Sequence, residues 1–271
     1  KDVHVLVVDD NSPDKTAQKV EALQTTYKER LFLLKRIGKQ GLGTAYIEGF
    51  KWCLSRSYEF IFEMDADFSH NPKDLQRLYD SCKIQNADVA VGSRYIKGVN
   101  VVNWPLARVL LSYGASLYVR VITGMKVLDP TAGFVCYKRK VLESIDLGAI
   151  KFIGYAFQIE MKYIAYKKNF KIKEIPIIFT DRINGGSKLS KGIISEAILG
   201  VIKMRLKTIL GTIYMYKKST LIKNACIVNE GKIIHGDVLI EDHYIKEISS
   251  SISVKSADVR VIDAENNYLI P

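Results

Sequence analysis

Short apolar runs alternate with amphipathic stretches along the first third of the chain. Four runs are apolar without polar alternation, as buried parallel strands are, and they lie at 3–8, 31–35, 60–64 and 88–91. Three amphipathic stretches between them have the spacing of helices, at 12–30, 44–55 and 72–84. The first begins with Ser12-Pro13-Asp14, which favours an N-terminal helical turn. This order predicts an α/β fold with a mostly parallel sheet and helices on both faces.

Two longer stretches mix apolar and basic residues at helical spacing, at 99–123 and 190–216. A basic amphipathic helix can lie in a membrane interface or pack on the protein's own core, and the pattern leaves both open. The uncharged apolar segments within them are shorter than the roughly 18–20 residues that a membrane span needs. We therefore expect peripheral contact with a membrane surface and no crossing of the membrane.

The character of the chain changes near residue 218. Beyond it, short strand-like runs such as 220–225 and 237–240 are separated by turn signals, Asn229-Glu230-Gly231 and His235-Gly236. We predict two domains, 1–218 and 219–271, of which the second is a small β-rich appendage.

The charge of the chain is concentrated in the first of these domains. The formal net charge of the whole chain is +11. Residues 219–271 hold five Lys/Arg and eight Asp/Glu, which leaves 35 basic against 21 acidic residues for 1–218. A basic body indicates nucleic acid, an anionic membrane or a phosphorylated substrate, or it serves solubility alone. The four cysteines form no CxxC pair, which favours reduced thiols in a cytoplasmic protein.

Two carboxylates follow the third predicted strand, in Asp65-Ala66-Asp67. Carboxylates two residues apart at a strand end can share one hard cation, and Mg²⁺ or Mn²⁺ prefers such oxygen ligands. An Asp-x-Asp pattern is common in solvated loops and is weak by itself. Its position directly after a buried strand, where ligands of parallel sheets bind, strengthens the prediction of a metal site.

Acidic and glycine-rich segments end the first two predicted strands. Asp9 and Asp10 end the first, where a carboxylate can accept hydrogen bonds from a nucleobase or ribose, or cap the following helix. The segment from Arg36 to Gly43, with Lys39 and Gly41, precedes a helix, and helix N-termini favour phosphate. It lacks the P-loop pattern, so the signal for phosphate binding is weak.

Several basic residues follow the fourth strand and are widely separated in the chain: Arg94, Arg108, Arg182 and Lys188, with Ser112 one turn after Arg108. Guanidinium groups bind phosphate oxygens bidentately. These residues could converge on an anionic acceptor, or they could be ordinary surface charges, which the residues alone favour.

Six strings, in this order, resemble the family 2 glycosyltransferases of GT-A fold, and among them the dolichyl- or polyprenyl-phosphate mannose synthases. They are VDDNSPDKT (8–16), GKQGLGTAYIEGF (38–50), EMDADFSHNP (63–72), VGSRYIKG (91–98), DPTAGF (129–134) and FTDRINGGSKLS (179–190). The resemblance implies inverting transfer of mannose from GDP-mannose to a polyprenyl phosphate on the cytoplasmic face of a membrane. A donor such as UDP-glucose or UDP-GlcNAc stays open, as does the oligomeric state, and no nucleic acid is expected.

The resemblance also implies roles for residues. Those implied for the metal are Asp65, Asp67 and Ser69. Those implied for the nucleotide are Asp9, Asp10, Lys39, Gly41, Asp65 and Ala66. Those implied for the acceptor phosphate are Arg94, Arg108, Ser112, Arg182 and Lys188, and the catalytic set is Asp67, Arg94 and Arg108. Asp129 lies near the donor sugar without a firm role.

Both ends of the chain differ from the family pattern. The family usually begins with an earlier strand ending in a Pro-Thr-Tyr-Asn-Glu-like segment, and this chain begins after it, so we expect an incomplete nucleotide pocket. Residues 220–271 resemble the opening β-segment of an amidohydrolase, particularly dihydroorotase, and stop before that family's metal motif. We therefore expect the second domain to be a partial amidohydrolase-like segment without dihydroorotase activity.

Overall fold

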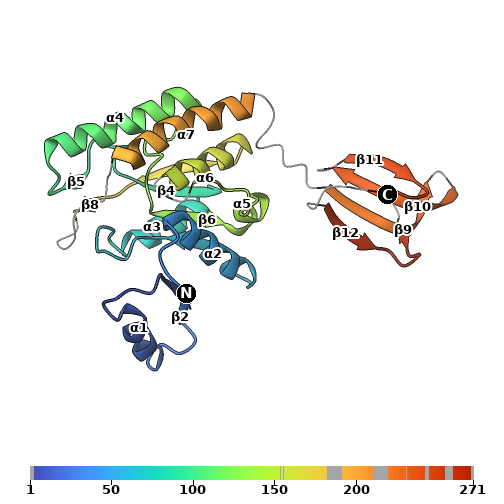
Figure 1. Ribbon diagram of the computed structural model, residues 1–271, viewed down its shortest axis with the longest axis horizontal. Helices are drawn as coiled ribbons and strands as arrows, with labels where there is room; N and C mark the ends of the chain where they lie inside the picture. The colour runs from blue at the N-terminus through green and yellow to red at the C-terminus, as the bar shows by residue number, and fades with distance from the viewer. Residues whose placement is uncertain are drawn as a thin grey trace. The chain divides into compact units, whose positions relative to one another are not determined.

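A computed structural model shows the fold of the chain (Figure 1). The residues it describes are 3–152, 154, 156–181, 191–209, 219–229, 231–241, 244–253 and 259–269. They belong to two compact units, Lys1–Tyr214 and Met215–Pro271. This division lies close to the boundary predicted at 218.

The first unit begins with a parallel strand pair. β1 (Val5–Asp9) pairs with β2 (Leu31–Lys35), and the connecting helix is α1 (Thr16–Gln24). The helix was predicted to continue to residue 30, but it ends at Gln24. The hydroxyl of Thr25 donates to the Ala22 carbonyl at 2.7 Å, and such local side-chain bonds compete with helical ones.

A mixed sheet forms the centre of this unit, in the strand order β3-β6-β4-β7. These strands are β3 (Phe60–Glu63), β6 (Val135–Lys138), β4 (Val89–Ser93) and β7 (Ile172–Pro176). β4 and β7 are parallel, whereas β6 is antiparallel to both of its neighbours. The sequence analysis did not predict β6, which separates β3 from β4.

Helices cover both faces of this sheet. One face packs against α2 (Leu42–Leu54), α5 (Arg139–Ser144) and α6 (Ala156–Lys167), and the other against α3 (Asp74–Lys83). Alternate residues of each strand serve the two faces, as the pleat requires. Val135 and Tyr137 belong to the cluster with Phe50 and Phe157, whereas Phe134 and Cys136 belong to the cluster with Leu78 and Cys82. The predicted fold class is confirmed.

The predicted helix at 99–123 begins later than expected. Its first part is β5 (Val101–Val102), which pairs with β8 (Phe179–Thr180), and α4 (Leu106–Thr123) follows. The cause is Pro105, which stands at the N-cap with an extended ψ of 143° and has no backbone N–H for a helical bond. Figure 1 shows α4 and α7 (Lys191–Ile209) side by side, and the Tyr118 hydroxyl of α4 donates to the Ile198 carbonyl of α7.

The second unit is β-rich, as predicted. Its five strands are β9 (Ser219–Asn229), β10 (Lys232–Glu241), β11 (Tyr244–Ser249), β12 (Val259–Asp263) and β13 (Tyr268–Leu269). β9 is central and pairs with β10, β12 and β13. The likeness of this unit to an amidohydrolase segment stays a prediction.

Candidate functional site

A cavity of about 1700 Å³ opens in the first unit. Its wall combines β1, α2, β3, the turn after β3, α4 and the segment before β6. Among the described strands, β1 pairs only with β2 and β3 only with β6, so the cavity lies between two open strand edges. The charged or titratable residues of its lining include Glu63, Asp65, Asp67, His70, Arg94 and Arg108. Of the predicted metal residues, Asp65 and Asp67 line the cavity and Ser69 does not, and the predicted acceptor residues Arg94, Arg108 and Ser112 line the same cavity.

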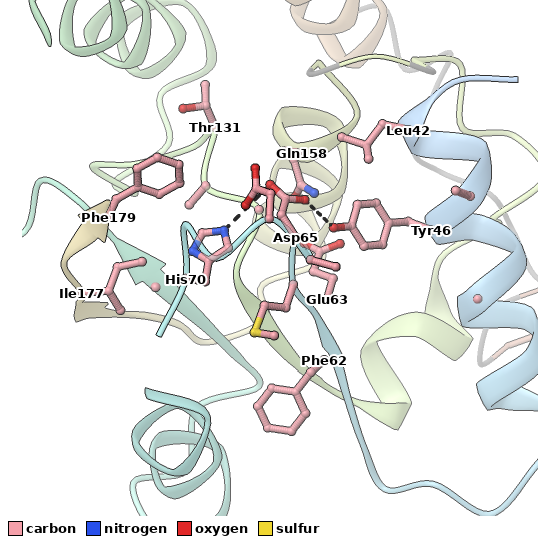
Figure 2. Close-up of a pocket in the computed structure, with 18 of the residues that line it drawn as sticks. Leu42, Tyr46, Phe62, Glu63, Asp65, His70, Thr131, Gln158, Ile177 and Phe179 are labelled. Atoms are coloured by element: carbon pink, nitrogen blue, oxygen red, sulfur yellow. Dashed lines mark hydrogen bonds and ion pairs between the residues drawn. The ribbon is translucent and has the colours of Figure 1, made fainter. Parts of the chain in front are cut away.

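Asp65 lies two residues beyond the end of β3 and is held from the side of α2. The hydroxyl of Tyr46 donates to Asp65 Oδ1 at 2.9 Å. Burial, followed by the charge of Asp65, raises the pKa of Tyr46 well above its ordinary value, so the phenol stays a donor at neutral pH. Nε2 of His70 lies 3.9 Å from Asp65 Oδ2 (Figure 2).

Asp67 is held by the turn that follows it. Both the backbone N–H and the hydroxyl of Ser69 donate to Asp67 Oδ1, at 3.1 and 2.5 Å. Between them, Phe68 adopts a left-handed conformation with φ of 63°, which tightens this turn. Ser69 therefore orients Asp67 in this structure, and its own role as a metal ligand stays a prediction.

The chemistry of this turn fits Mg²⁺ or Mn²⁺. Asp65 and Asp67 offer hard carboxylate oxygens on one cavity wall, and such ions usually take one or two carboxylates and complete their shell with water and phosphate. Among the described residues, no group of three or more His, Cys, Asp or Glu side chains could hold a metal.

Arg94, at the end of β4, forms a buried ion pair with Asp129. Its backbone N–H and Nε donate to Asp129 Oδ2 at 2.9 and 2.7 Å, and Nη2 donates to Oδ1 at 2.6 Å. Burial alone would raise the pKa of Asp129, but the charge and hydrogen bonds of Arg94 outweigh it and lower that pKa. Nη2 also donates to the hydroxyl of Thr131 at 2.7 Å. The sequence analysis assigned no firm role to Asp129, and the structure shows that this carboxylate anchors Arg94.

Arg108 lies on α4 at a more open position. Its Nη1 donates to Asp181 at 2.6 Å, and its guanidinium lies 4.2 Å from the centre of the Trp104 ring. One turn further along α4, the hydroxyl of Ser112 accepts a hydrogen bond from Tyr95 at 2.7 Å. Arg94, Arg108 and Ser112 all line the cavity, so the acceptor residues predicted within the described chain share one cavity.

A buried polar layer lies beneath the carboxylates. Glu63 accepts a hydrogen bond from the Tyr137 hydroxyl at 3.3 Å, and Lys162 donates to the Ala132 carbonyl at 2.6 Å. Burial raises the pKa of Glu63 to about 8 and lowers the pKa of Lys162 to about 8, and each charge partly offsets the shift of the other. The sequence analysis missed both residues. The position of Glu63, a charged residue inside an apolar strand, could have indicated a buried polar role. The sequence around Lys162 offered no such indication.

The predicted nucleotide residues divide into two groups. Asp65 and Ala66 line the cavity, whereas Asp9, Asp10, Lys39 and Gly41 are not among its lining residues. Asp10 accepts hydrogen bonds from Nε and Nη2 of Arg36, at 2.6 and 2.7 Å. Asp9 is buried and accepts the backbone N–H of Ser12 at 3.1 Å. This bond lies in the loop before α1, whose N-cap is Lys15 and has no side-chain cap hydrogen bond, so Asp9 does not cap the helix.

Lys39 is exposed, and Gly41 stands at the N-cap of α2 with φ of 102°. That conformation favours glycine, and the Gly41 carbonyl accepts the Thr44 hydroxyl at 2.8 Å. The contacts given for Asp9, Asp10 and Gly41 are with other residues of the chain, and the nucleotide-binding role of all four residues stays a prediction. Arg182 and Lys188, predicted for the acceptor, lie outside the described residues.

Comparison with known proteins adds to this geometry. Residues 1–146 match the family described as Glycosyl transferase family 2. The chain is 44% identical over 205 residues to the polyprenol monophosphomannose synthase of Mycolicibacterium smegmatis, covering 76% of this chain and 77% of that protein. It is 42% identical over 202 residues to the undecaprenyl-phosphate mannosyltransferase of Micrococcus luteus, covering 74% and 82%.

Solved structures resemble the fold. Glucosyl-3-phosphoglycerate synthase from Mycobacterium tuberculosis, in complex with Mn²⁺, UDP and glucosyl-3-phosphoglycerate, gives a TM-score of 0.52 at 16% identity, covering 77% of this chain and 69% of that one. The same enzyme with Mg²⁺ and UDP gives a TM-score of 0.51 at 16% identity, covering 76% and 68%. At such identity the likeness shows the fold alone.

Proposed function

Since this chain belongs to glycosyl transferase family 2, we propose that it transfers mannose from GDP-mannose to a polyprenyl phosphate. The observation that carries the proposal is the pairing, in one cavity, of the Asp65-Ala66-Asp67 turn with Arg94 and Arg108. The first suits a nucleotide diphosphate through a cation, and the second suits a second phosphate. Relatives at 44% and 42% identity, whose names contain mannose and a polyprenyl carrier, support both substrates.

The carboxylate side of the cavity binds the donor in this proposal. Asp65 and Asp67 hold Mg²⁺ or Mn²⁺, which when bound supplies positive charge beside the diphosphate that leaves. Tyr46 and Ser69 fix the directions of these two carboxylates. Ser69 is the third candidate ligand, and the nucleotide residues beyond the cavity wall are Asp9, Asp10, Lys39 and Gly41.

The arginine side binds the acceptor. A lipid phosphate is anionic at neutral pH, so it needs orientation and no general base. Arg108, with Ser112 one turn away, contacts the phosphate, and Arg94 shapes the wall behind it through Asp129. A phosphate oxygen attacks the anomeric carbon opposite the diphosphate. The new carbon–oxygen bond forms as the sugar–diphosphate bond breaks and GDP departs, so the anomeric centre inverts. Catalysis then rests on proximity and charge placement.

The lipid substrate requires a membrane, and α4 and α7 carry the apolar surface for it. Among the described residues of these two helices, the exposed large hydrophobic ones are Leu106, Leu110, Leu111, Tyr113, Leu117, Val121, Ile198, Leu199, Ile202 and Leu206. Within the described residues, α4 alone is long and apolar enough to cross a membrane by length and composition. It carries Arg108 and Arg120 and packs on α7, so we propose that it lies along the membrane surface.

A donor panel tests the substrate assignment. Purified full chain is incubated with undecaprenyl phosphate in detergent, with Mg²⁺ or Mn²⁺, and with radiolabelled GDP-mannose, UDP-glucose or UDP-GlcNAc. We expect a labelled, mild-acid-labile lipid product from GDP-mannose only, and its loss when EDTA is added. The variant Asp67→Asn should lose this product. Its matched control is Asp80→Asn, on the surface of α3, which should keep it.

Lipid product from UDP-glucose and none from GDP-mannose would contradict the mannose donor and leave the family reaction in place. Product from GDP-mannose in the absence of any divalent cation would contradict the role assigned to Asp65 and Asp67.

A further inference from the structure

Asp65 lies beyond the end of β3, so strand pairing does not set the orientation of its side chain. It follows β3, whose recorded strand pairing is with β6 on one side. The side chain of Asp65 is 38% exposed in the cavity wall. A carboxylate that binds a cation needs a defined orientation, and neighbouring hydrogen bonds usually provide it. The question is which side chains orient Asp65.

Tyr46 is the first of two such side chains. It reaches Asp65 Oδ1 from α2 at 2.9 Å. Its ring is stacked on Phe157, with centroids 5.9 Å apart and planes 5° apart, and Phe157 is fully buried. The phenol is therefore anchored by packing that does not depend on the hydroxyl. Removing the hydroxyl alone would leave that packing in place.

His70 is the second, and it approaches from the opposite side (Figure 2). It is only 5% exposed, and within the part of the chain that the structure describes neither ring nitrogen has a hydrogen-bond partner. Its ring lies 5.0 Å from Phe134 and 5.2 Å from Phe179. Leaving a buried polar group unsatisfied costs about 1–3 kcal/mol, so a buried imidazole in this state calls for an explanation.

Asp65 lies within reach of the imidazole. Nε2 is 3.9 Å from Asp65 Oδ2, which is beyond hydrogen-bond length, and a shift of about 1 Å would bring the two atoms within it. The Tyr46 hydroxyl bonds to Oδ1 of Asp65, whereas His70 lies near Oδ2 of the same carboxylate.

We infer that Tyr46 and His70 are positioning residues that hold Asp65 in the orientation that binds the divalent cation, with His70 Nε2–H closing on Oδ2 when the cation is bound. The inference rests on the cation site of the proposed function. Neither a phenol nor an imidazole carries the permanent positive charge of a guanidinium. An arginine in either place would weaken the attraction between Asp65 and the cation.

Mn²⁺ binding to the purified full chain tests this directly, because it needs no turnover. The free Mn²⁺ signal in electron paramagnetic resonance gives the dissociation constant, with GDP present. We expect Tyr46→Phe and His70→Phe each to weaken Mn²⁺ binding about 10-fold or more, the usual size for partners of metal ligands. We expect His70→Gln, which keeps a donor near the place of Nε2, to restore most of the affinity.

Tyr163→Phe is the matched control, because it removes a phenol that donates to Thr208 at 3.1 Å and lies outside the cavity wall. It should bind Mn²⁺ as the unchanged chain does. Wild-type affinity in both Tyr46→Phe and His70→Phe, beside lost affinity in Asp67→Asn, would overturn this inference and leave the cation site standing. Absence of Mn²⁺ binding by the unchanged chain would overturn both.

Kinetics separate positioning from general damage to the fold. If Tyr46 acts through Asp65, the Mn²⁺ concentration for half-maximal transfer should rise in Tyr46→Phe while kcat at saturating Mn²⁺ stays close to that of the unchanged chain. A lower kcat with an unchanged Mn²⁺ requirement would contradict the positioning role.

Discussion

The two sides of the cavity hold their charges in different ways. On the carboxylate side, the recorded hydrogen bonds to Asp65 and Asp67 come from the hydroxyls of Tyr46 and Ser69 and from a backbone N–H. On the arginine side, Arg94 and Arg108 are paired with carboxylates within the protein. The first side offers carboxylate oxygens, which are the ligands that a hard cation prefers. On the second side, the positive charge of each arginine is already compensated by a carboxylate, so an arriving phosphate competes with that carboxylate.

The arginine side is itself divided. The pair of Arg94 with Asp129 is buried, with side-chain exposures of 10% and 0%, whereas the pair of Arg108 with Asp181 has 26% and 24%. Breaking a buried pair leaves an uncompensated charge, and breaking a partly exposed one is much less costly. We conclude that Arg94 chiefly fixes the wall and that Arg108 is the arginine able to change partners.

The largest effect is expected on the carboxylate side. Asp67→Asn keeps the size of the side chain and one acceptor for Ser69 while removing the charge that attracts a cation. We expect kcat/KM for mannosyl transfer to fall at least about 1000-fold, since charge stabilisation at such sites is worth several kcal/mol. The circular dichroism spectrum and Tm should stay unchanged. Near-normal turnover would remove Asp67 from the site.

The next effect concerns stability. Asp129→Asn leaves the guanidinium of Arg94 buried without its counter-charge, which should cost about 3–5 kcal/mol in the free energy of unfolding of the first unit. Urea denaturation followed by tryptophan fluorescence measures it, because Trp52 and Trp104 both lie in this unit. A loss below about 1 kcal/mol would contradict the anchoring role.

The same pair sets a pH dependence. The folded-state pKa of Asp129 is lowered below 3.8, so its contribution to stability is present above pH 3.8 and is lost as pH falls through the folded pKa. The stability difference between Asp129→Asn and the unchanged chain should therefore be constant from neutral pH to about pH 5 and shrink below pH 4. A difference that grows in acid would contradict the lowered pKa.

A smaller effect is expected at Arg108. Arg108→Ala should raise KM for undecaprenyl phosphate about 10-fold to 100-fold, as loss of one charge-assisted hydrogen bond predicts, with the KM for GDP-mannose unchanged. Arg108→Lys keeps the charge and loses the guanidinium that lies over the Trp104 ring, so its KM for undecaprenyl phosphate should lie between those of the unchanged chain and Arg108→Ala. A rise in the donor KM instead would place Arg108 on the other side of the reaction.

The smallest effect is expected outside the cavity. Leu106 and Val121 of α4 are 73% and 72% exposed and do not line the cavity. The double variant Leu106→Gln/Val121→Gln should lower binding to anionic phospholipid vesicles by roughly 3-fold to 10-fold, because less apolar surface is buried in the interface. Transfer to a short-chain, water-soluble acceptor should be unaffected. Unchanged vesicle binding would contradict the orientation proposed for α4.

Local patterns predicted the elements of the fold far better than their pairing. The strands β2 and β3 begin at the predicted residues, because apolar runs and helix signals are local. The place of β6 between β3 and β4 depends on pairing across more than 40 residues, for which a short run such as Val135–Lys138 carries no local sign. The predicted start of the helix at 99 ignored Pro105, although this residue carried a usable signal.

The residues of the site that form a short sequence motif could be predicted from the sequence. Asp65-Ala66-Asp67 was found from its place after a strand, and the arginines gained a role only through resemblance to a family. What the sequence could not show is which groups touch: Asp129 as the partner of Arg94, or Tyr46 and His70 around Asp65. These contacts join residues far apart in the chain, or, for His70, depend on how one turn folds back.

Binding of the two substrates, measured separately, tests the division of the cavity most directly. Titration calorimetry with Mn²⁺ and GDP, and with undecaprenyl phosphate in detergent, compares the unchanged chain with Asp67→Asn and Arg108→Ala. We predict that Asp67→Asn loses Mn²⁺–GDP binding and keeps lipid phosphate binding, whereas Arg108→Ala keeps Mn²⁺–GDP binding and binds the lipid phosphate more weakly. If both variants lose the same ligand, the cavity does not hold donor and acceptor on separate sides.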